Sequence, residues 1–332
     1  MYRSLIIASP TLITAEVISS WLETGNEIAE VWCCEPDSPF LRPPKSLAGK
    51  IFPEFDSVRI LQRAGVNVRL CPPLKHWAGA CSAARATGAD VLVTLQTLNI
   101  VPQEVLSVFG DHAINFHPSL LPGYRGSAPR QGMLLDDAAD EFGGITMHCL
   151  TEGIDEGPII AQRRCPASDA SNMFEWDHMI ARSAASMVEL ELPAFLNGNL
   201  RAQDQVPGSG SYRRVSQTEK VLTSALTLED LEKRFRGVGR YFAMSWADMA
   251  GQTPQAVTGI YSRIGPPTGT PAKTTSLFLE VDICDARIRL RRKSVLYQLS
   301  RVVARLSAMQ RWRRKKSIQG VNNARTADPV LR

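Results

Sequence analysis

The sequence predicts an α/β protein with a doubly wound, mostly parallel sheet, followed by a smaller β-rich domain. In the first 200 residues, short runs rich in Ile, Val and Leu alternate with segments of helical periodicity, as is typical of strands that are buried on both faces and joined by helices. Beyond a stretch rich in Pro, Gly and Ser, the pattern changes to short β-like segments. At 332 residues, the chain is long enough for two domains.

The first domain is expected to hold alternating strands and helices. Its strands are expected at SLIIAS (4–9) and then at 27–34, 66–71, 89–95, 112–117 and 143–150. Its first helix carries Val17, Ile18, Trp21 and Leu22 on one face, with Gly25 placed to end it. Further helices are expected at 57–65, 76–88, 102–109, 128–136 and 172–196. Prolines and glycines between residues 35 and 55 indicate a long loop.

The second half predicts a separate, smaller unit. Residues 200–214 have the composition of a linker. A helix is expected at 227–239, where Thr227 and Asp230 have the spacing of a capping box. The segments AVTGIYSRI, SLFLEVDI and ARIRLRR then predict a small barrel or sandwich. The expected boundaries are 1–199, 200–214, 215–292 and 293–332.

The composition is that of a globular protein without a metal site. Seven cysteines lie mostly within apolar runs, and no CxxC or Cys/His spacing indicates zinc. Buried thiols in a reducing compartment are the better explanation. The N-terminus has too short an apolar run for a signal peptide, and no stretch reaches the roughly 18 apolar residues of a membrane span. We therefore expect a cytoplasmic protein.

Charge is unevenly distributed along the chain. Residues 287–332 contain 14 Lys or Arg against one acid, a balance of +13, which leaves −8 for residues 1–286 out of the total of +5. Within this tail, 294–317 places Val295, Leu299, Val302, Val303, Leu306 and Met309 at helical spacing beside many basic residues. Such a helix can contact RNA, lie on an anionic membrane, or simply dock on the protein with a solvated face. The last residues, 322–332, are expected to be disordered.

Polar residues at a strand end indicate a functional site. In open α/β sheets, ligands bind at the carboxyl ends of the strands. Asn115 and His117 end the run HAINFH, and residues two apart on a strand project to the same side. Asp155 follows a later strand in a Gly-flanked loop, so its carboxylate can approach the same crevice. Each residue alone is better explained by a strand terminus or by turn chemistry.

The combination resembles a known family. The run INFHPSLLPGYRGSAPRQ, with Asp155 in GIDEGPI, is similar to the formyltransferases that use 10-formyltetrahydrofolate. These are methionyl-tRNA formyltransferase, the amino-sugar N-formyltransferases and glycinamide ribonucleotide transformylase. The resemblance implies their Rossmann-like catalytic fold for the first domain, and a divergent form of the methionyl-tRNA formyltransferase C-terminal domain for 215–292.

The resemblance also implies roles for the site residues. Asn115 would donate an N–H to the oxyanion of the formyl group, and His117 would donate to it or take the amine proton. Asp155 would orient the imidazole of His117. Ser119, Leu120, Leu121 and Pro122 would line the site of the folate co-substrate, with no metal.

The acceptor amine is not fixed by these motifs. The loop after the second strand carries Arg42, Lys45 and Lys50 against four acids, which makes it a poor contact for RNA phosphates. The Ile-Asp-Trp triplet that the family usually carries after the linker is replaced here by KVLTSAL. We therefore expect a small-molecule amine such as a nucleotide-linked amino sugar, and initiator Met-tRNA stays open as the alternative.

Three other classes of protein are weighed against specific features of the sequence. A nicotinamide dehydrogenase is disfavoured because the first strand-to-helix turn lacks the glycines of a phosphate turn. A formyltetrahydrofolate hydrolase would use the same three polar residues, but such enzymes usually carry a regulatory domain ahead of the catalytic one. A non-catalytic folate-binding homologue is disfavoured by the intact Asn, His and Asp. The unusual segment TLQTLNIVP (94–102) leaves the affinity for the donor open. The sequence does not predict an oligomeric state.

Overall fold

The computed structural model describes residues 1–41, 47–239, 244–248, 253–293 and 302–314. Contacts within the chain divide these residues into two units. The first unit comprises 1–117, 144–206 and the C-terminal helix 302–314, and the second comprises 118–143 and 207–293. No helix among the described residues is long and apolar enough to cross a membrane.

The first unit is built on a seven-stranded sheet in the order β3-β2-β1-β4-β5-β6-β7. Its strands are β1 (Arg3–Ala8), β2 (Glu27–Cys33), β3 (Val68–Leu70), β4 (Val91–Leu95), β5 (Ala113–His117), β6 (Gly144–Cys149) and β7 (Ile159–Arg164). β1 to β5 pair in parallel, and β6 runs antiparallel to both β5 and β7. The sequence interpretation of a mostly parallel sheet is thus confirmed, and β7 is a strand that it did not include.

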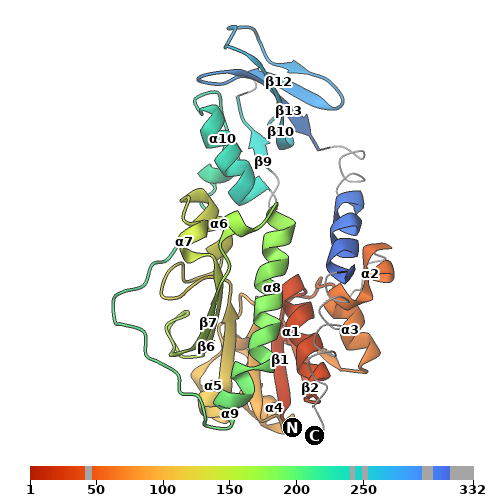
Figure 1. Cartoon of the computed structure of the whole chain (residues 1–332), viewed down its shortest axis with the longest axis vertical. Helices are drawn as coiled ribbons and strands as arrows, with labels where there is room; N and C mark the ends of the chain where they lie inside the picture. The colour runs from red at the N-terminus through yellow and green to blue at the C-terminus, as the bar shows by residue number, and fades with distance from the viewer. Residues whose placement is uncertain (42–46, 240–243, 249–252, 294–301, 315–332) are drawn as a thin grey trace, which may run out of the picture. The chain divides into compact units, whose positions relative to one another are not determined.

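Helices cover the two faces of this sheet (Figure 1). They are α1 (Leu12–Glu23), α2 (Leu47–Ile51), α3 (Ser57–Arg63), α4 (Ala80–Ala86), α5 (Gln103–Phe109), α8 (Met173–Glu189) and α9 (Glu191–Leu196), with short 3-10 turns at Pro53–Phe55, Leu74–His76, Gly110–His112 and Ala167–Asp169. On β1, Leu5 and Ile7 pack in one cluster with residues of α4 and α5. Because side chains alternate along a strand, Ile6 points to the opposite face, and it is also buried. α1 packs along α8.

The predicted helix 172–196 is interrupted in the structure. It forms α8 and α9, with Leu190 between them. Pro193 has no N–H to donate to the carbonyl of Glu189, so one i to i−4 bond of a continuous helix is lost there. The start of α8 follows a local rule, since the side chain of Asn172 accepts from the backbone N–H of Phe174 and Glu175.

The C-terminal helix 302–314 belongs to the core of the first unit. Ala308, Met309 and Trp312 are buried against Phe52 and Phe55. The Trp312 ring stacks on His178 with centroids 4.3 Å apart and an interplanar angle of 6°. Val302 and Val303 are exposed, so the buried stripe is narrower than the sequence periodicity predicts. Residues 294–301, 315–317 and 322–332, which the tail predictions also include, lie outside the described residues.

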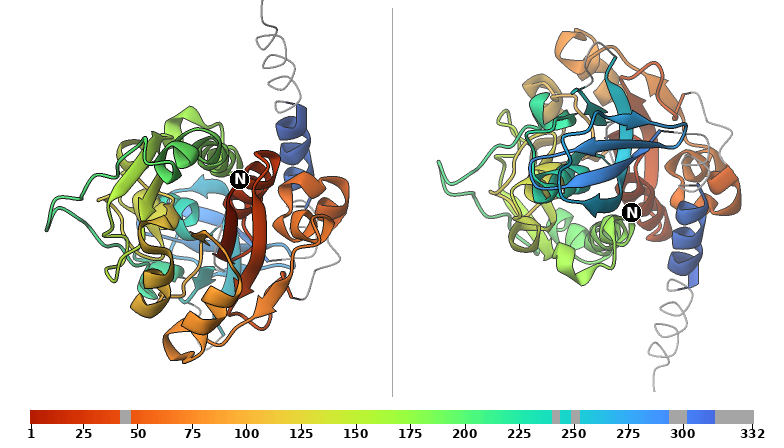
Figure 2. Two further views of the ribbon diagram at one scale, coloured as in Figure 1. Left: turned by 90° about the horizontal axis from the view of Figure 1, so that it is seen from below. Right: turned by 90° about the horizontal axis from the view of Figure 1, so that it is seen from above.

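The second unit holds a six-stranded sheet in the order β11-β12-β13-β10-β9-β8. Its elements are α6 (Pro129–Leu135), α7 (Ala139–Phe142), a 3-10 turn at Thr218–Lys220, β8 (Val221–Leu222), α10 (Leu228–Arg234), a π-helical turn at Phe235–Gly239, β9 (Met244–Trp246), β10 (Gln255–Gly265), β11 (Lys273–Thr274), β12 (Phe278–Asp282) and β13 (Arg287–Arg292). Figure 2 shows the strands of this sheet crossing as it curls. The predicted capping box is present, because Thr227 and Asp230 bond each other's backbone N–H.

Candidate active site

Three polar side chains form a row across the centre of the first sheet. Asn115 on β5 lies opposite Thr94 on β4 and opposite His148 on β6. Strands pair with their side chains in register, so these three residues project to the same face. His117, two residues after Asn115, projects to that face as well.

Asn115 is held by hydrogen bonds on both ends of its amide. Its Oδ1 accepts from the Thr94 hydroxyl at 2.8 Å. Its Nδ2 lies 3.0 Å from Nε2 of His148 and 3.3 Å from Oδ1 of Asp155. An ionised carboxylate can only accept, so the end of the amide that faces Asp155 carries the N–H groups, and these face the His148 and Asp155 side chains.

His148 is buried, and its two nitrogens have different partners. Nδ1 lies 2.8 Å from the carbonyl oxygen of Cys149, which can only accept a hydrogen bond, so Nδ1 carries the proton. In the neutral ring, Nε2 then has a lone pair and accepts from Asn115. Nε2 also lies 3.5 Å from Oδ1 of Asp155.

The loop after β6 brings Asp155 to this row. Asp155 has a φ of +54°, a left-handed conformation that Asp tolerates better than most residues. A Cβ at Gly157 would overlap the carbonyl of Cys149, so only glycine allows the loop to return this close to β6. The amide of Gln205 donates to the carbonyls of both residues, Asp155 at 2.9 Å and Gly157 at 2.8 Å, and so closes the loop.

Asp155 also faces His117. Its Oδ2 lies 3.4 Å from Nδ1 of His117, and the two side chains are 12% and 5% exposed. A carboxylate and an imidazole with so little solvent around them interact strongly, because water screens them weakly. Asn115, His117 and Asp155, which the sequence analysis singled out, are thus brought together in one cluster.

The turn Ser119–Pro122 follows His117 in the chain and belongs to the second unit. Ser119 is fully buried, and its hydroxyl donates to the carbonyl of Gly123 at 2.8 Å. Leu121 is buried and precedes a cis bond to Pro122, whereas Leu120 and Pro122 are half-buried. The turn is therefore compact, and its partly exposed side chains are those of Leu120 and Pro122.

Sequence reasoning missed Thr94, His148 and Gln205. The strand containing His148 was expected, but its register against β5 depends on an antiparallel pairing that no local signal reports. Gln205 lies in a stretch whose composition is that of a linker. Across the described ranges, no group of three or more His, Cys, Asp or Glu side chains is arranged to hold a metal ion.

Comparison with known proteins finds relatives of this chain. The sequence pattern of the family described as Formyl transferase matches residues 74–183, a segment that includes Thr94, Asn115, His117, His148 and Asp155. Methionyl-tRNA formyltransferase of Halorhodospira halophila is 29% identical over 238 residues, which cover 70% of this chain and 75% of that protein. These matches support a formyltransferase family for this chain. They indicate an enzyme of one-carbon transfer.

Solved structures share the fold of this chain at low identity. One is the N-formyltransferase from Helicobacter canadensis in complex with folinic acid and dTDP-3-aminofucose, with a TM-score of 0.58 and 15% identity over 87% of this chain and 99% of that one. Another is WlaRD, a sugar 3N-formyl transferase in the presence of dTDP and 5-N-formyl-THF, with a TM-score of 0.57 and 14% identity over 89% and 99%. Enzymes of this family use a formyl-tetrahydrofolate as the one-carbon donor.

Proposed function

We propose that this formyltransferase moves the formyl group of 10-formyltetrahydrofolate to a primary amine, with Asn115, His117 and Asp155 as the reacting cluster. The observation that carries the proposal is their convergence. Asp155 lies 3.3 Å from the amide of Asn115 and 3.4 Å from the imidazole of His117, in a mostly buried setting. An amide donor, an imidazole and a carboxylate are the groups that an acyl transfer to an amine requires.

His117 is proposed to carry the proton. Its Nδ1 faces Asp155, and a proton held there leaves a lone pair on Nε2 for the amine. The amine nitrogen forms a bond to the formyl carbon and gives its proton to Nε2. The bond from that carbon to N10 of the folate then breaks, and the proton passes to N10. The carboxylate of Asp155 stabilises the imidazolium between these steps.

Asn115 is proposed to stabilise the negative charge on the formyl oxygen. Thr94 holds the Asn115 carbonyl, so the amide N–H groups keep a fixed direction. Because both N–H groups already face His148 and Asp155, one of them must be shared with the oxyanion in the transition state. His148 is proposed as a positioning residue that fixes this amide through Nε2.

The donor is proposed to lie along the turn of Ser119, Leu120, Leu121 and Pro122. Support comes from the half-buried side chains of Leu120 and Pro122, which offer an apolar edge to a folate. The buried hydroxyl of Ser119 bonds within the turn and would shape it rather than reach the ligand.

A small amine, such as a nucleotide-linked amino sugar, is the proposed acceptor. The loop at residues 35–56 carries four acids against three basic residues, which disfavours contact with RNA phosphates. The structural relative from Helicobacter canadensis was solved with dTDP-3-aminofucose, an acceptor of this type.

Initiator Met-tRNA is the second candidate, and a feature of the second unit favours it. On the curled sheet, the rings of Tyr261 and Phe278 lie 4.6 Å apart. Arg291 lies over Tyr261 and Arg289 over Phe278, each 5.6 Å from the ring centroid. The Tyr261 ring is exposed and the Phe278 ring is half-buried. Accessible aromatic rings flanked by arginines are suited to stacking with bases. Glu280 pairs with Arg289 and neutralises part of that charge.

Formyl transfer to the two acceptors decides between them. Purified enzyme is given 10-formyltetrahydrofolate with either a panel of nucleotide-linked amino sugars or charged initiator Met-tRNA, and formylated product is measured. We expect turnover with an amino sugar and none with Met-tRNA. The reverse result would assign the tRNA as substrate, and absence of transfer to both would refute the proposed acceptor classes.

A further inference from the structure

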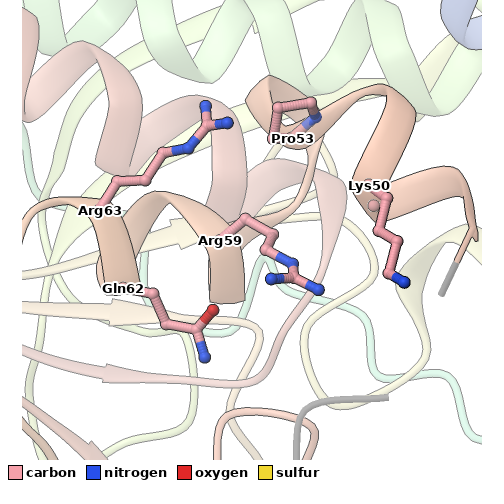
Figure 3. A pocket seen from close by; sticks show the side chains of 6 residues that line it. Lys50, Pro53, Arg59, Gln62 and Arg63 are labelled. Atoms are coloured by element: carbon pink, nitrogen blue, oxygen red, sulfur yellow. The ribbon is translucent and has the colours of Figure 1, made fainter. Parts of the chain in front are cut away.

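A cationic pocket lies in the first unit, away from the reacting cluster. It has a volume of about 290 Å³ and is formed between α2, the turn Pro53–Phe55 and α3. Its lining residues are Gly49, Lys50, Pro53, Arg59, Gln62 and Arg63 (Figure 3). Three cations and one amide thus surround this pocket, and none of the residues that line it carries a carboxylate.

The cations are placed against the preferences of an isolated helix. Arg59 is the third residue of α3, in the first turn, where the helix dipole favours negative charge. Arg63 follows four residues later on the same face, and like charges at this spacing destabilise a helix. The dipole explains Lys50 and Arg63, which lie in the last turns of their helices, but it does not explain Arg59.

The carboxylates next to the pocket are engaged elsewhere. Asp56 caps α3, accepting from the backbone N–H of Val58 at 3.1 Å and of Arg59 at 3.4 Å. Glu54 is held by the guanidinium of Arg313 from the C-terminal helix, with Nη2 to Oε2 at 3.0 Å. Among the described residues, no carboxylate forms an ion pair with Lys50, Arg59 or Arg63. The pocket therefore keeps its positive charge.

The wall of the pocket is built by a close approach of α2 and α3. A Cβ at Gly49 would overlap the carboxylate of Asp56, so a larger residue there would displace the side chain that caps α3. In Figure 3, the side chains of Arg59 and Lys50 extend into the same space. The approach of the two helices thus brings the cations to one pocket.

We propose that this pocket binds the phosphate group of a small anionic ligand, through Lys50, Arg59 and Arg63 with Gln62 as a further donor. A guanidinium matches phosphate oxygens with two parallel N–H donors, and Lys50 adds a point charge. A volume of about 290 Å³ is at the small end of ligand pockets, so one or two phosphate groups fit while the rest of the ligand lies outside. The pocket shares no residue with the cluster of Asn115, His117 and Asp155, and it does not depend on the proposed formyl transfer.

Calorimetric titration of the full chain with pyrophosphate tests the proposal. We expect saturable binding of one equivalent. Arg59→Gln and Arg63→Gln should each weaken the affinity by about tenfold or more, because each removes charge-assisted hydrogen bonds. Arg85→Gln on α4 is the matched control, since Arg85 is an exposed arginine on another helix. The affinity of this variant for pyrophosphate should stay within twofold of the wild type. Circular dichroism establishes that the variants are folded.

A nucleoside diphosphate, titrated in parallel, identifies the source of the phosphate. Tighter binding than pyrophosphate indicates that a nucleotide is the ligand, and equal binding indicates recognition of the phosphates alone; both support the site. The proposal is overturned if pyrophosphate does not saturate, or if Arg85→Gln weakens binding as much as Arg59→Gln does, since the attraction would then be one of overall charge.

Discussion

Two substitutions, His148→Asn and His148→Gln, each keep one of the two hydrogen bonds of His148 and remove the other. Asn at this position places an N–H near that of Nδ1 and keeps the bond to the Cys149 carbonyl, but it leaves no acceptor at Nε2. Gln places an acceptor near Nε2 and keeps the partner of Asn115, but it loses the bond to Cys149. The pair therefore tests whether His148 acts through Asn115 or only supports the strand.

The magnitude follows from the burial of the site. In His148→Asn, one N–H of Asn115 loses its acceptor in a setting that is mostly closed to water. An unsatisfied buried donor costs about 1–3 kcal/mol. If that cost raises the barrier of the transition state because the amide is misplaced, kcat falls about 5- to 150-fold. His148→Gln should retain most of the activity.

Steady-state formyl transfer at varied pH, with the acceptor that gives turnover, provides the assay. We expect the loss in His148→Asn to lie in kcat, with the KM of the folate donor unchanged and the pH profile of both variants like that of the wild type. Equal losses in the two variants would refute action through Asn115. Loss of a limb of the pH profile in both would instead make His148 a proton carrier.

Three further outcomes are expected. His117→Ala and Asp155→Asn should each lower kcat by about a hundredfold or more with folding intact, as judged by circular dichroism, because each removes a positioned acid–base group; wild-type rates would reject the cluster. Trp312→Ala should weaken the docking of helix 302–314 by a free energy of about 3 kcal/mol, because a buried ring is lost. Amide hydrogen exchange, which should be faster in that helix, checks this. Arg213 lowers the pKa of Glu219 to about 2, so the stability from this pair is full above the ordinary pKa near 4.5 and is lost as the pH falls toward 2. Glu219→Gln should remove about 1 kcal/mol at pH 7 and flatten the melting temperature between pH 5 and 2, which thermal melts would measure.

The sequence of the C-terminal helix predicts its secondary structure but not its contacts. Its helical spacing and basic character were visible, and docking was one of three roles that the sequence left open. Trp312 was not among its expected apolar positions, although the stack on His178 is a principal contact of the docked helix. Its partners, including Phe55 and His178, are more than 130 residues away in the chain, and a pattern within one helix carries no information about them.

The sequence by itself determined the alternation of strands and helices, the capping box at Thr227, and Asn115, His117 and Asp155 as candidates, because each rests on local periodicity or on a contiguous motif. Tertiary structure decided the rest. It paired β6 antiparallel to β5, which placed His148 beside Asn115 and fixed the direction of the amide. Register between strands depends on the packing of whole faces of the sheet. The ion pair of Glu54 with Arg313 depends on a helix far along the chain. Neither leaves a signal in the residues nearby.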